Sequence, residues 1–462
     1  MMLLSEAAKA TNARLSAVDV EFFSVGTDSR KIVKGQLFVA LKGEHFDGHD
    51  YAAQALAQGA AAVLVSNPEL GLEPAIVVED TCQALGALAA YWRSKFKIPV
   101  IAITGSNGKT TVKEMITAIL AAKVGGLEAI HATVGNLNNH IGLPLTLLKL
   151  RATHQFSVLE MGMSHLGEID YLTRIAKPTV AVINNAGTAH IGEVGSRDNI
   201  AKAKGEIFAG LSDDGVAVIN ADDDYAAYWE SLNTNKKIVT FGLKNQADVS
   251  ATYEEKQGIS QVYLSTPQGS ISFKLNMLGA HNVSNALAAS AVAVALGASN
   301  TEITCGLENF GGVKGRLQRK AAFNGAALID DTYNANPDSM KAAIDVLAKF
   351  QGKKILVLGD MGELGADAKN MHAEIGAYAK AAGLTELYCL GDLSLEMVRG
   401  FGIGAHHYAI PESIAEAVKP LLSHDATVLV KGSRFMKMER VVDLLEKDLL
   451  NEKLEKTLRE NE

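Results

Sequence analysis

Short apolar runs separated by helical patterns recur along the whole chain. In its middle part they stand at 100–103, 157–162, 179–185, 215–220 and 237–242. Strands that read as continuous apolar runs and alternate with helices are typical of a parallel sheet covered on both faces. Ligands of such sheets bind at the carboxyl ends of the strands. We therefore expect the functional side chains of this part of the chain to follow its strands directly.

Patterns of the same kind before and after this stretch predict two further α/β units. In the first unit we expect a helix over 51–58 and strands at 37–43, 60–66 and 75–80. In the last unit each strand ends in a glycine or acidic turn, and the four strands lie within 326–340, 353–365, 386–392 and 427–435. Such a succession predicts a nucleotide-type α/β fold, followed by a charged helical end at 451–462.

The stretch IPVIAITGSNGKTT, residues 98–111, joins the first central strand to a helix. Its glycines Gly105 and Gly108 break the strand before a helical pattern begins. A strand, a glycine loop with a lysine and a hydroxyl, and a helix form the arrangement in which free backbone N–H groups bind a phosphate. In this pattern Lys109 reaches the β- and γ-phosphates and Thr110 ligates Mg²⁺. The alternative is an ordinary strand-to-helix turn with a solvated lysine.

Composition and charge narrow the class of protein. At 462 residues the chain is long enough for about three domains of roughly 150 residues. A hydrophobic content of 48% with only 6% aromatic residues fits an α/β protein packed with small aliphatic side chains. The 44 basic and 52 acidic residues give a net charge of −8, which argues against a general nucleic-acid binder but allows a local basic phosphate pocket.

Cysteine usage and hydropathy point to the cytoplasm. The cysteines Cys82, Cys305 and Cys389 lie far apart and show no metal-ligand spacing, so we expect reduced thiols. The first residues carry charges too early for the apolar region of a signal peptide. No run approaches 18 uninterrupted apolar residues, so no membrane span is predicted.

Several polar residues follow the predicted strands and helix starts. Glu160 is expensive to bury in an apolar strand unless it is paired or holds a metal, so it is either a Mg²⁺ ligand or a structural hydrogen-bonding group. A functional role for His190 depends on its position beside the phosphate loop. Asn282 and Asn285, one turn apart, either contact a purine edge or cap their helix. On the helix predicted over 199–208, Lys202 and Lys204 face different sides. Without further information, we interpret both as solvated side chains.

Seven motifs, in this order and spread over all three units, resemble the Mur ligases of peptidoglycan synthesis. They are TGSNGKTT, VLEMG, NNAGTAHIG, AKAKGEIF, GAHNVSNALAA, KGRLQ and IDDTYNANPDSM. Within the family, TYNANP and the stretch DSR…FVALKGEHFDGHDY are most similar to the member that joins D-alanyl-D-alanine to UDP-N-acetylmuramoyl-tripeptide. The D-N-P-R signature of the diaminopimelate-adding member is absent. The general phosphate-loop pattern has a glycine where this chain has Ile103, and the family's shortened loop has this form.

The resemblance implies an α/β fold of three domains. A small α/β N-terminal domain over 1–97 binds the UDP-substrate, and a central P-loop ATPase domain with a mainly parallel sheet covers 98–314. A C-terminal Rossmann-like α/β domain covers 315–462. The implied reaction phosphorylates a peptide carboxylate with ATP, and an amine then attacks the acyl phosphate to give an amide, ADP and phosphate. Because two anions must approach each other, nearby cations are needed to offset their repulsion.

The resemblance also implies which residues act at the phosphate end of ATP. Lys109, His190 and Lys204 are the expected catalytic residues. One Mg²⁺ is held by Thr110 and Glu160, and a second is held through His190 and Lys204, which is carbamylated by CO₂. A carbamate turns a lysine cation into a carboxylate-like metal ligand. The AKGEIF motif selects Lys204 rather than the lysine two residues before it.

Nucleotide contacts are implied in the same way, with the C-terminal unit closing over ATP and excluding water. The loop residues that hold the phosphates are Gly105, Ser106, Asn107, Gly108, Lys109, Thr110 and Thr111. Asn282 and Asn285 face adenine, and Arg316 and Asp331 reach the phosphates and ribose.

Contacts to the other two substrates are implied on all three units. The UDP-peptide is expected at Ser29, Arg30, His45, Asn138 and Asn139. D-alanyl-D-alanine is expected near Tyr333 and Asn334. The enzyme is expected to act as a monomer.

Other functions keep some of these features. A ligase of the same family that adds a different amino acid, or a folylpolyglutamate synthetase, would retain the phosphate loop, Glu160 and His190 and differ in the first unit. A non-catalytic nucleotide-binding regulator would retain the loop alone, but every expected metal and phosphate position holds a competent residue. A P-loop motor or GTPase is disfavoured because its switch signatures are not visible.

Overall fold

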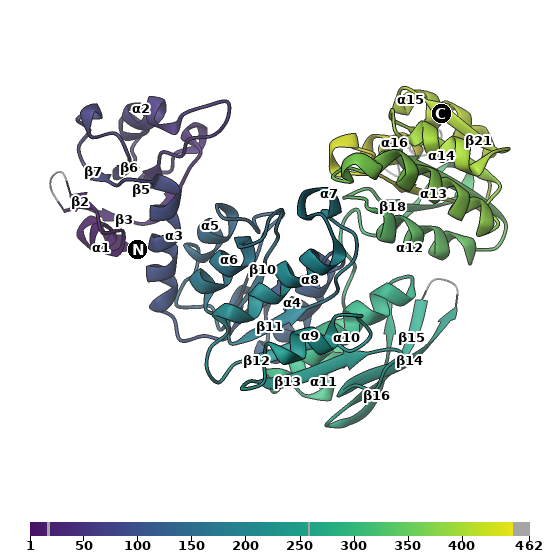
Figure 1. The fold of residues 1–462 in the computed structure, drawn as a ribbon, viewed down its shortest axis with the longest axis horizontal. Coiled ribbons are helices and arrows are strands. Elements are labelled where there is room, and N and C mark those ends of the chain that lie inside the picture. Colours follow the sequence, from purple (N-terminus) through teal and green to yellow (C-terminus); the bar gives the residue numbers. More distant parts are fainter. Residues whose placement is uncertain (16–18, 257–258, 447–462) are drawn as a thin grey trace, which may run out of the picture.

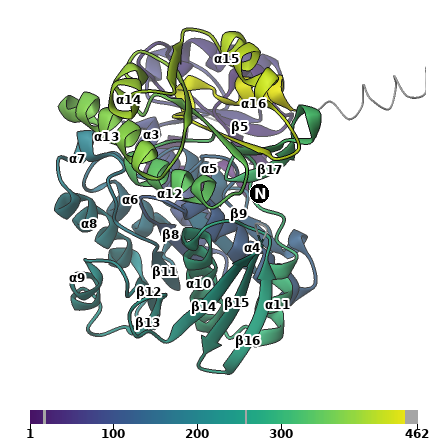
Figure 2. The ribbon, with the colours of Figure 1, turned by 90° about the vertical axis from the view of Figure 1, so that its right-hand side faces the viewer.

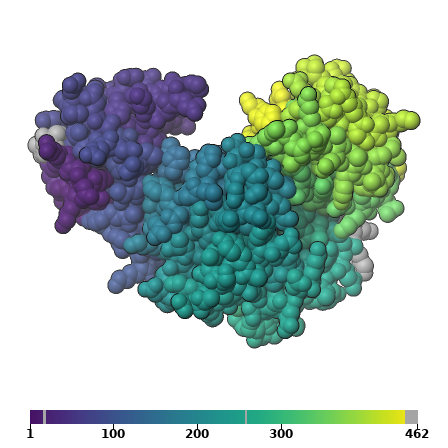
Figure 3. Space-filling view, in the orientation of Figure 1, coloured from purple at the N-terminus to yellow at the C-terminus, as the bar shows by residue number. Residues whose placement is uncertain are grey.

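The computed structural model describes residues 1–15, 19–256 and 259–446, which form three α/β units in chain order (Figure 1). The first and last units stand on either side of the central one, and the space-filling view shows a hollow between them (Figure 3). The charged tail at 451–462 lies outside the described residues. Within the described ranges, no helix has both the length and the apolar character that a membrane crossing needs.

The N-terminal unit is built on a sheet in the order β2-β7-β6-β5-β4, parallel except at β2. The three predicted strands and the predicted helix are found as β5, β6, β7 and α2. The elements of this unit are β1 (Met2–Leu3), α1 (Leu4–Ala10), β2 (Arg14–Leu15), β3 (Glu21–Phe22), β4 (Ser24–Gly26), β5 (Gln36–Val39), α2 (Ala52–Ala57), β6 (Ala62–Val65), β7 (Ala75–Val77) and α3 (Thr81–Ser94). Strand β7 ends earlier than predicted because Asp80 accepts hydrogen bonds from Cys82 and Gln83 and so caps α3.

The described part of the central unit contains a sheet in the order β16-β15-β14-β13-β12-β11-β8-β10-β9. It is parallel from β9 to β14, and only the hairpins at β14, β15 and β16 are antiparallel, which confirms the mainly parallel sheet. The strands are β8 (Val100–Thr104), β9 (Ile130–Ala132), β10 (Phe156–Glu160), β11 (Val180–Ile183), β12 (Val216–Asn220), β13 (Lys237–Gly242), β14 (Val249–Lys256), β15 (Ile259–Thr266) and β16 (Gly269–Leu275).

Helices cover both faces of this sheet. Along β8, Val100 and Ala102 pack into one hydrophobic cluster while Ile101 and Ile103 pack into another, because successive side chains point to opposite faces. Figure 2 shows α10 and α11 beside the antiparallel strands. The helices are α4 (Lys109–Val124), α5 (Gly142–Leu147), α6 (Glu168–Ala176), α7 (Ile191–Val194), α8 (Arg197–Gly205), α9 (Ala226–Ser231), α10 (Ala280–Ala295) and α11 (Asn300–Glu308).

The C-terminal unit has a sheet in the order β17-β18-β22-β19-β20-β21, parallel except at β17. The four predicted strands are β18, β19, β20 and β22. The elements are β17 (Gln318–Ala321), β18 (Ala327–Asp331), α12 (Pro337–Ala348), β19 (Lys353–Gly359), α13 (Ala368–Ala381), β20 (Glu386–Leu390), α14 (Ser394–Phe401), β21 (Ala405–Tyr408), α15 (Pro411–Val418), β22 (Ala426–Lys431) and α16 (Glu439–Leu445). The sheet lies between two clusters of buried aliphatic side chains.

Glycines let α13 and α14 pack closely in this unit. A Cβ at Gly376 would overlap the carbonyl oxygen of Met397, and a Cβ at Gly400 would overlap that of Ala373. Because both obstacles are backbone atoms, a side-chain rotation cannot relieve the overlap.

We expect Gly376→Ala to lower the free energy of unfolding of the C-terminal unit by about 1–3 kcal/mol, even though alanine favours helix more than glycine does. Chemical denaturation followed by circular dichroism measures this change. Gly311→Ala is the matched control, because a Cβ there would meet no atom within 4 Å. Equal stability of the two variants would contradict the packing argument.

Candidate active site

The phosphate loop runs from the end of β8 into the first turn of α4, which Lys109, Thr110 and Thr111 form. Gly108 has a φ of 82°, and a Cβ there would overlap side-chain atoms of Asn184 and Asn285. Only glycine therefore fits this position. Free N–H groups at the start of α4 face the region where a phosphate would bind.

Lys109 folds back over its own loop. Its Nζ donates a hydrogen bond of 2.6 Å to the carbonyl oxygen of Gly105. Burial lowers the pKa of the Lys109 ammonium, while the Glu160 carboxylate acts in the opposite direction. This lysine therefore lies beside the predicted metal-binding carboxylate.

Two asparagines that follow β11 hold the loop from behind. Asn184 Nδ2 donates to the carbonyl oxygen of Asn107 and to Asn285 Oδ1, each at 2.9 Å. Asn185 Oδ1 accepts from the N–H of Asn107, and its carbonyl oxygen accepts from the N–H of Ser106. This Asn-Asn pair was not predicted as part of the site, although its place at the carboxyl end of a central strand was a usable signal.

Glu160 ends β10 and is 3% exposed. Its Oε2 accepts a hydrogen bond of 3.0 Å from Thr110 Oγ1, and its Oε1 accepts one of 2.9 Å from Asn138 Nδ2. The N–H of Glu160 donates to Thr133 Oγ1 at 3.0 Å. The two predicted Mg²⁺ ligands, Thr110 and Glu160, are thus in contact with each other. Asn138 is hydrogen-bonded to the same carboxylate.

Lys204 lies in the last turn of α8 and is 2% exposed, whereas Lys202 on the same helix is exposed. Burial lowers the pKa of the Lys204 ammonium well below its usual value, and the Lys109 cation lowers it further, while Asp223 opposes them. The two lysines therefore do lie on different faces, and the buried one is the lysine that the motif selected.

His190 meets the C-terminal unit. Its Nδ1 lies 2.7 Å from Glu363 Oε2, and this contact lowers the pKa of the Glu363 carboxyl. Glu363 was not singled out in the sequence. Among the described residues, no three His, Cys, Asp or Glu side chains gather as a complete metal site.

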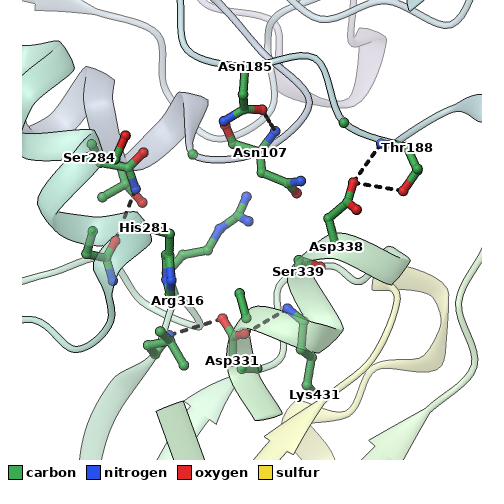
Figure 4. A pocket seen from close by; sticks show the side chains of 18 of the residues that line it. Asn107, Asn185, Thr188, His281, Ser284, Arg316, Asp331, Asp338, Ser339 and Lys431 are labelled. Atoms are coloured by element: carbon green, nitrogen blue, oxygen red, sulfur yellow. Dashed lines mark hydrogen bonds and ion pairs between the residues drawn. The ribbon is translucent and has the colours of Figure 1, made fainter. Parts of the chain in front are cut away.

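A cavity of about 470 Å³ lies between the central and C-terminal units. Its walls include Asn107, Gly108 and Thr111 of the phosphate loop. They also include Asn282, Asn285, Arg316 and Asp331, so the four nucleotide contacts predicted outside the loop lie on one cavity. Figure 4 shows Asn107 and Asn185 on one side and Asp331 and Lys431 on the opposite side, with Thr188 and Asp338 in contact between them.

Asp331 and Arg316 have fixed partners on the wall of this cavity. Lys431 Nζ donates to Asp331 Oδ2 at 2.7 Å and to the carbonyl oxygen of Asn334 at 2.9 Å. The guanidinium of Arg316 lies over the ring of Tyr333, 4.1 Å from its centre. Lys431 is buried and was missed in the sequence, because it belongs to a strand about 100 residues away from its partner.

A second cavity of about 730 Å³ borders the first. From the central unit it is lined by Lys109, Thr110, Asn138, Asn139, Glu160 and His190, and from the C-terminal unit by Arg316, Tyr333, Asn334, Glu363 and Arg434. Asn139 also caps α5, because its Oδ1 accepts hydrogen bonds from Ile141 and Gly142. The expected metal residues thus face the expected amine-binding residues across one space.

The remaining predicted residues lie on the N-terminal unit and line neither cavity. Ser29 and Arg30 belong to a short 3₁₀ turn, where the Arg30 guanidinium pairs with Asp28. His45 is exposed in the loop after β5. These side chains are therefore separated from the phosphate loop in this structure.

The α12 helix links the C-terminal unit to the phosphate loop. Asn336 caps α12 through its Oδ1, which accepts from the N–H of Ser339, and its Nδ2 donates to Asn107 Oδ1 at 2.8 Å. Asp338 in the first turn of α12 accepts hydrogen bonds from the N–H and hydroxyl of Thr188. The side-chain amide of Asn336 thus both caps α12 and contacts the phosphate loop.

Comparison with known proteins places this arrangement in a family. Three family models match: "Mur ligase family, catalytic domain" over residues 21–93, "Mur ligase middle domain" over 103–293, and "Mur ligase, glutamate ligase domain" over 315–434. The UDP-N-acetylmuramoyl-tripeptide–D-alanyl-D-alanine ligase of Escherichia coli (strain K12) is 42% identical over 451 residues, which cover 96% of this chain and 98% of that protein.

Solved structures agree with the sequence matches. A crystal structure of MurF from Acinetobacter baumannii superposes with a TM-score of 0.88 at 39% identity, covering 96% of this chain and 98% of that one. MurF ligase from Thermotoga maritima, solved in complex with ADP, has a TM-score of 0.84 at 30% identity and covers 93% and 98%. With three matching domain models and these relatives over nearly its whole length, the chain belongs to the Mur ligase family.

Proposed function

We propose that this chain is an ATP-dependent ligase that joins D-alanyl-D-alanine to the peptide carboxylate of UDP-N-acetylmuramoyl-tripeptide, in cytoplasmic peptidoglycan precursor synthesis. The observation that carries the proposal is the bordering pair of cavities, which sets the phosphate loop opposite Tyr333 and Asn334. The E. coli relative named for this activity matches 96% of the chain. The enzyme acts as a monomer in this proposal, since both cavities are built from one chain.

ATP binding in this proposal uses the smaller cavity. Asn282 and Asn285 lie at the start of α10 and face the base, while Asp331, held by Lys431, faces the ribose. Burial lowers the pKa of Lys431, but Asp331 favours its charged form, so the pair remains a fixed polar wall. The family is ATP-dependent, and the T. maritima structure was solved with ADP.

Phosphoryl transfer in this proposal takes place in the second cavity. Lys109 turns from the Gly105 carbonyl to the phosphates, where its charge offsets the repulsion between ATP and the peptide carboxylate. Arg316, which lines both cavities, adds a second cation. The acyl phosphate formed there is then open to the amine held near Tyr333 and Asn334.

The residues present fit a magnesium ion. Mg²⁺ is usually bound through one or two carboxylates together with substrate phosphates and water, so Thr110 and Glu160 form a sufficient protein part. When bound, the ion neutralises charge on the phosphates. Asn138 and Thr133 orient Glu160 through its side chain and its N–H.

Lys204 fits a carbamate. Burial without a hydrogen bond to any described residue favours the neutral amine, and only a neutral amine can add to CO₂. The carbamate would give the site a further anionic oxygen ligand, near the Lys109 charge that acts on Lys204. We propose this modification as the source of a second Mg²⁺ site.

Substrate preference tests the proposed function directly. With UDP-N-acetylmuramoyl-tripeptide present, we expect ADP release to depend on D-alanyl-D-alanine and not on diaminopimelate, lysine or glutamate, because the amine must fit the cavity beside Tyr333. A coupled ADP assay measures this, with Lys109→Ala as the inactive control. Release that depends on another amine, or nucleotide binding without release, would overturn the assignment.

The role of Lys204 is tested by chemical rescue. We expect Lys204→Ala to lose activity by at least about 100-fold, and a short carboxylic acid to restore part of it by replacing the carbamate oxygen. The matched control is Lys202→Ala on the exposed face of α8, which should retain activity. Near-normal activity of Lys204→Ala without added acid would show the assignment to be wrong.

Domain closure is tested by solution scattering. The hollow between the outer units separates the UDP-substrate side from the phosphate loop, so the outer units must approach for reaction (Figure 3). We expect the radius of gyration to fall when an ATP analogue and the UDP-substrate are added together, more than with either alone. An unchanged radius would count against closure.

A further inference from the structure

The contact between His190 and Glu363 joins two units at the second cavity. The distance from His190 Nδ1 to Glu363 Oε2 is 2.7 Å, a close contact between imidazole and carboxylate that is not aligned as a hydrogen bond, and among the described residues this buried nitrogen has no hydrogen-bond partner. Both residues have a positive φ, 63° for His190 and 61° for Glu363. Non-glycine residues rarely adopt this conformation, and it persists only where the surrounding structure determines it.

Backbone contacts hold the two residues at this point. The N–H of Gly192 donates to the carbonyl oxygen of Glu363 at 3.1 Å, and a Cβ at Gly192 would press on the backbone of Gly365. On the other side of His190, Thr188 donates two hydrogen bonds to Asp338. The segment that carries His190 is therefore fixed to the C-terminal unit both before and after the imidazole.

The chemistry of imidazole gives this contact a consequence. A carboxylate beside one ring nitrogen favours a proton there, so the other nitrogen is left as an acceptor with a defined direction. Glu363 Oε2 lies within ion-pair distance of Nδ1, and His190 lines the cavity that Lys109, Thr110 and Glu160 also line. A histidine of the central unit is thus oriented by a side chain of the C-terminal unit.

We propose that Glu363 is a positioning residue for the ligase reaction, which holds the imidazole of His190 in its working tautomer and orientation only while the C-terminal unit is docked. The proposal rests on the proposed function in giving His190 a role at the phosphate end of ATP. Docking and assembly of the site are then one event. ATP cannot react in the undocked state, where water has access.

The chain offers a matched control for the docking contact itself. Lys349, after α12, pairs with Glu255 of β14, so it also joins the C-terminal unit to the central one. Neither residue lines the two cavities. Loss of this pair removes one contact between the two units without touching the imidazole.

The tautomer of His190 is the first readout. In nucleotide-free protein labelled with ¹⁵N-histidine, the signals of His190 are identified by their absence in His190→Ala. We expect Glu363→Ala to shift both ring-nitrogen resonances toward those of a free imidazole, Glu363→Gln to retain part of the wild-type pattern because its amide oxygen still accepts, and Lys349→Ala to leave it unchanged. Identical resonances in Glu363→Ala and the wild type would overturn the proposal, and this arm holds whichever amine the enzyme uses.

Kinetics give the second readout. We expect Glu363→Ala to reduce kcat by about 10- to 100-fold and to raise the Mg²⁺ concentration needed for half activity, with Glu363→Gln between it and the wild type. Lys349→Ala should keep both values. An equal loss in Lys349→Ala would reduce Glu363 to a docking contact, and a change confined to KM for the amine would place it on the substrate; either result would overturn the proposal.

Discussion

The absence of a side chain at Gly108 is the constraint on which the active site depends. The amide of Asn184 contacts both the Asn107 carbonyl and Asn285. A Cβ at residue 108 would collide with this amide, so the contacts require glycine there. This packing joins the end of β11, the phosphate loop and the start of α10. The proposed phosphate and base ends of the nucleotide site are therefore parts of one connected arrangement.

Buried charged groups surround this arrangement, and each has a distinct environment. Glu160 accepts from Thr110 and Asn138, and Lys431 is paired with Asp331, so both charges are compensated by protein atoms. Lys204 lacks a described hydrogen-bonding partner, and its ammonium is disfavoured by burial. In the proposed reaction, this difference distinguishes the compensated charges from the Lys204 amine, which would add to CO₂.

Polar side chains join the central and C-terminal units beside the phosphate loop, while Leu278 of the central unit packs into the hydrophobic cluster of the C-terminal unit. Asn336 touches Asn107, Asp338 touches Thr188, and Glu363 faces His190. Such contacts are compatible with the domain closure proposed above, because polar groups become hydrated when two units part. These contacts also lie on the phosphate loop and on the segment that carries His190. The position of the C-terminal unit therefore affects the geometry of the site in the central unit.

The sequence by itself determined the α/β class, the mainly parallel sheet and the phosphate loop, because strand burial, helix periodicity and glycine turns are local properties of the chain. It indicated the family through the resemblance of seven short motifs. Glu160, Thr110, Asn282 and Asn285 could be named for the same reason, since each follows a strand or opens a helix. Only the tertiary structure decided the partners: Lys431 with Asp331, Asn184 with the loop, and Glu363 with His190. These pairs come from segments that are distant along the chain, and no local pattern specifies which polar groups folding brings within hydrogen-bonding distance.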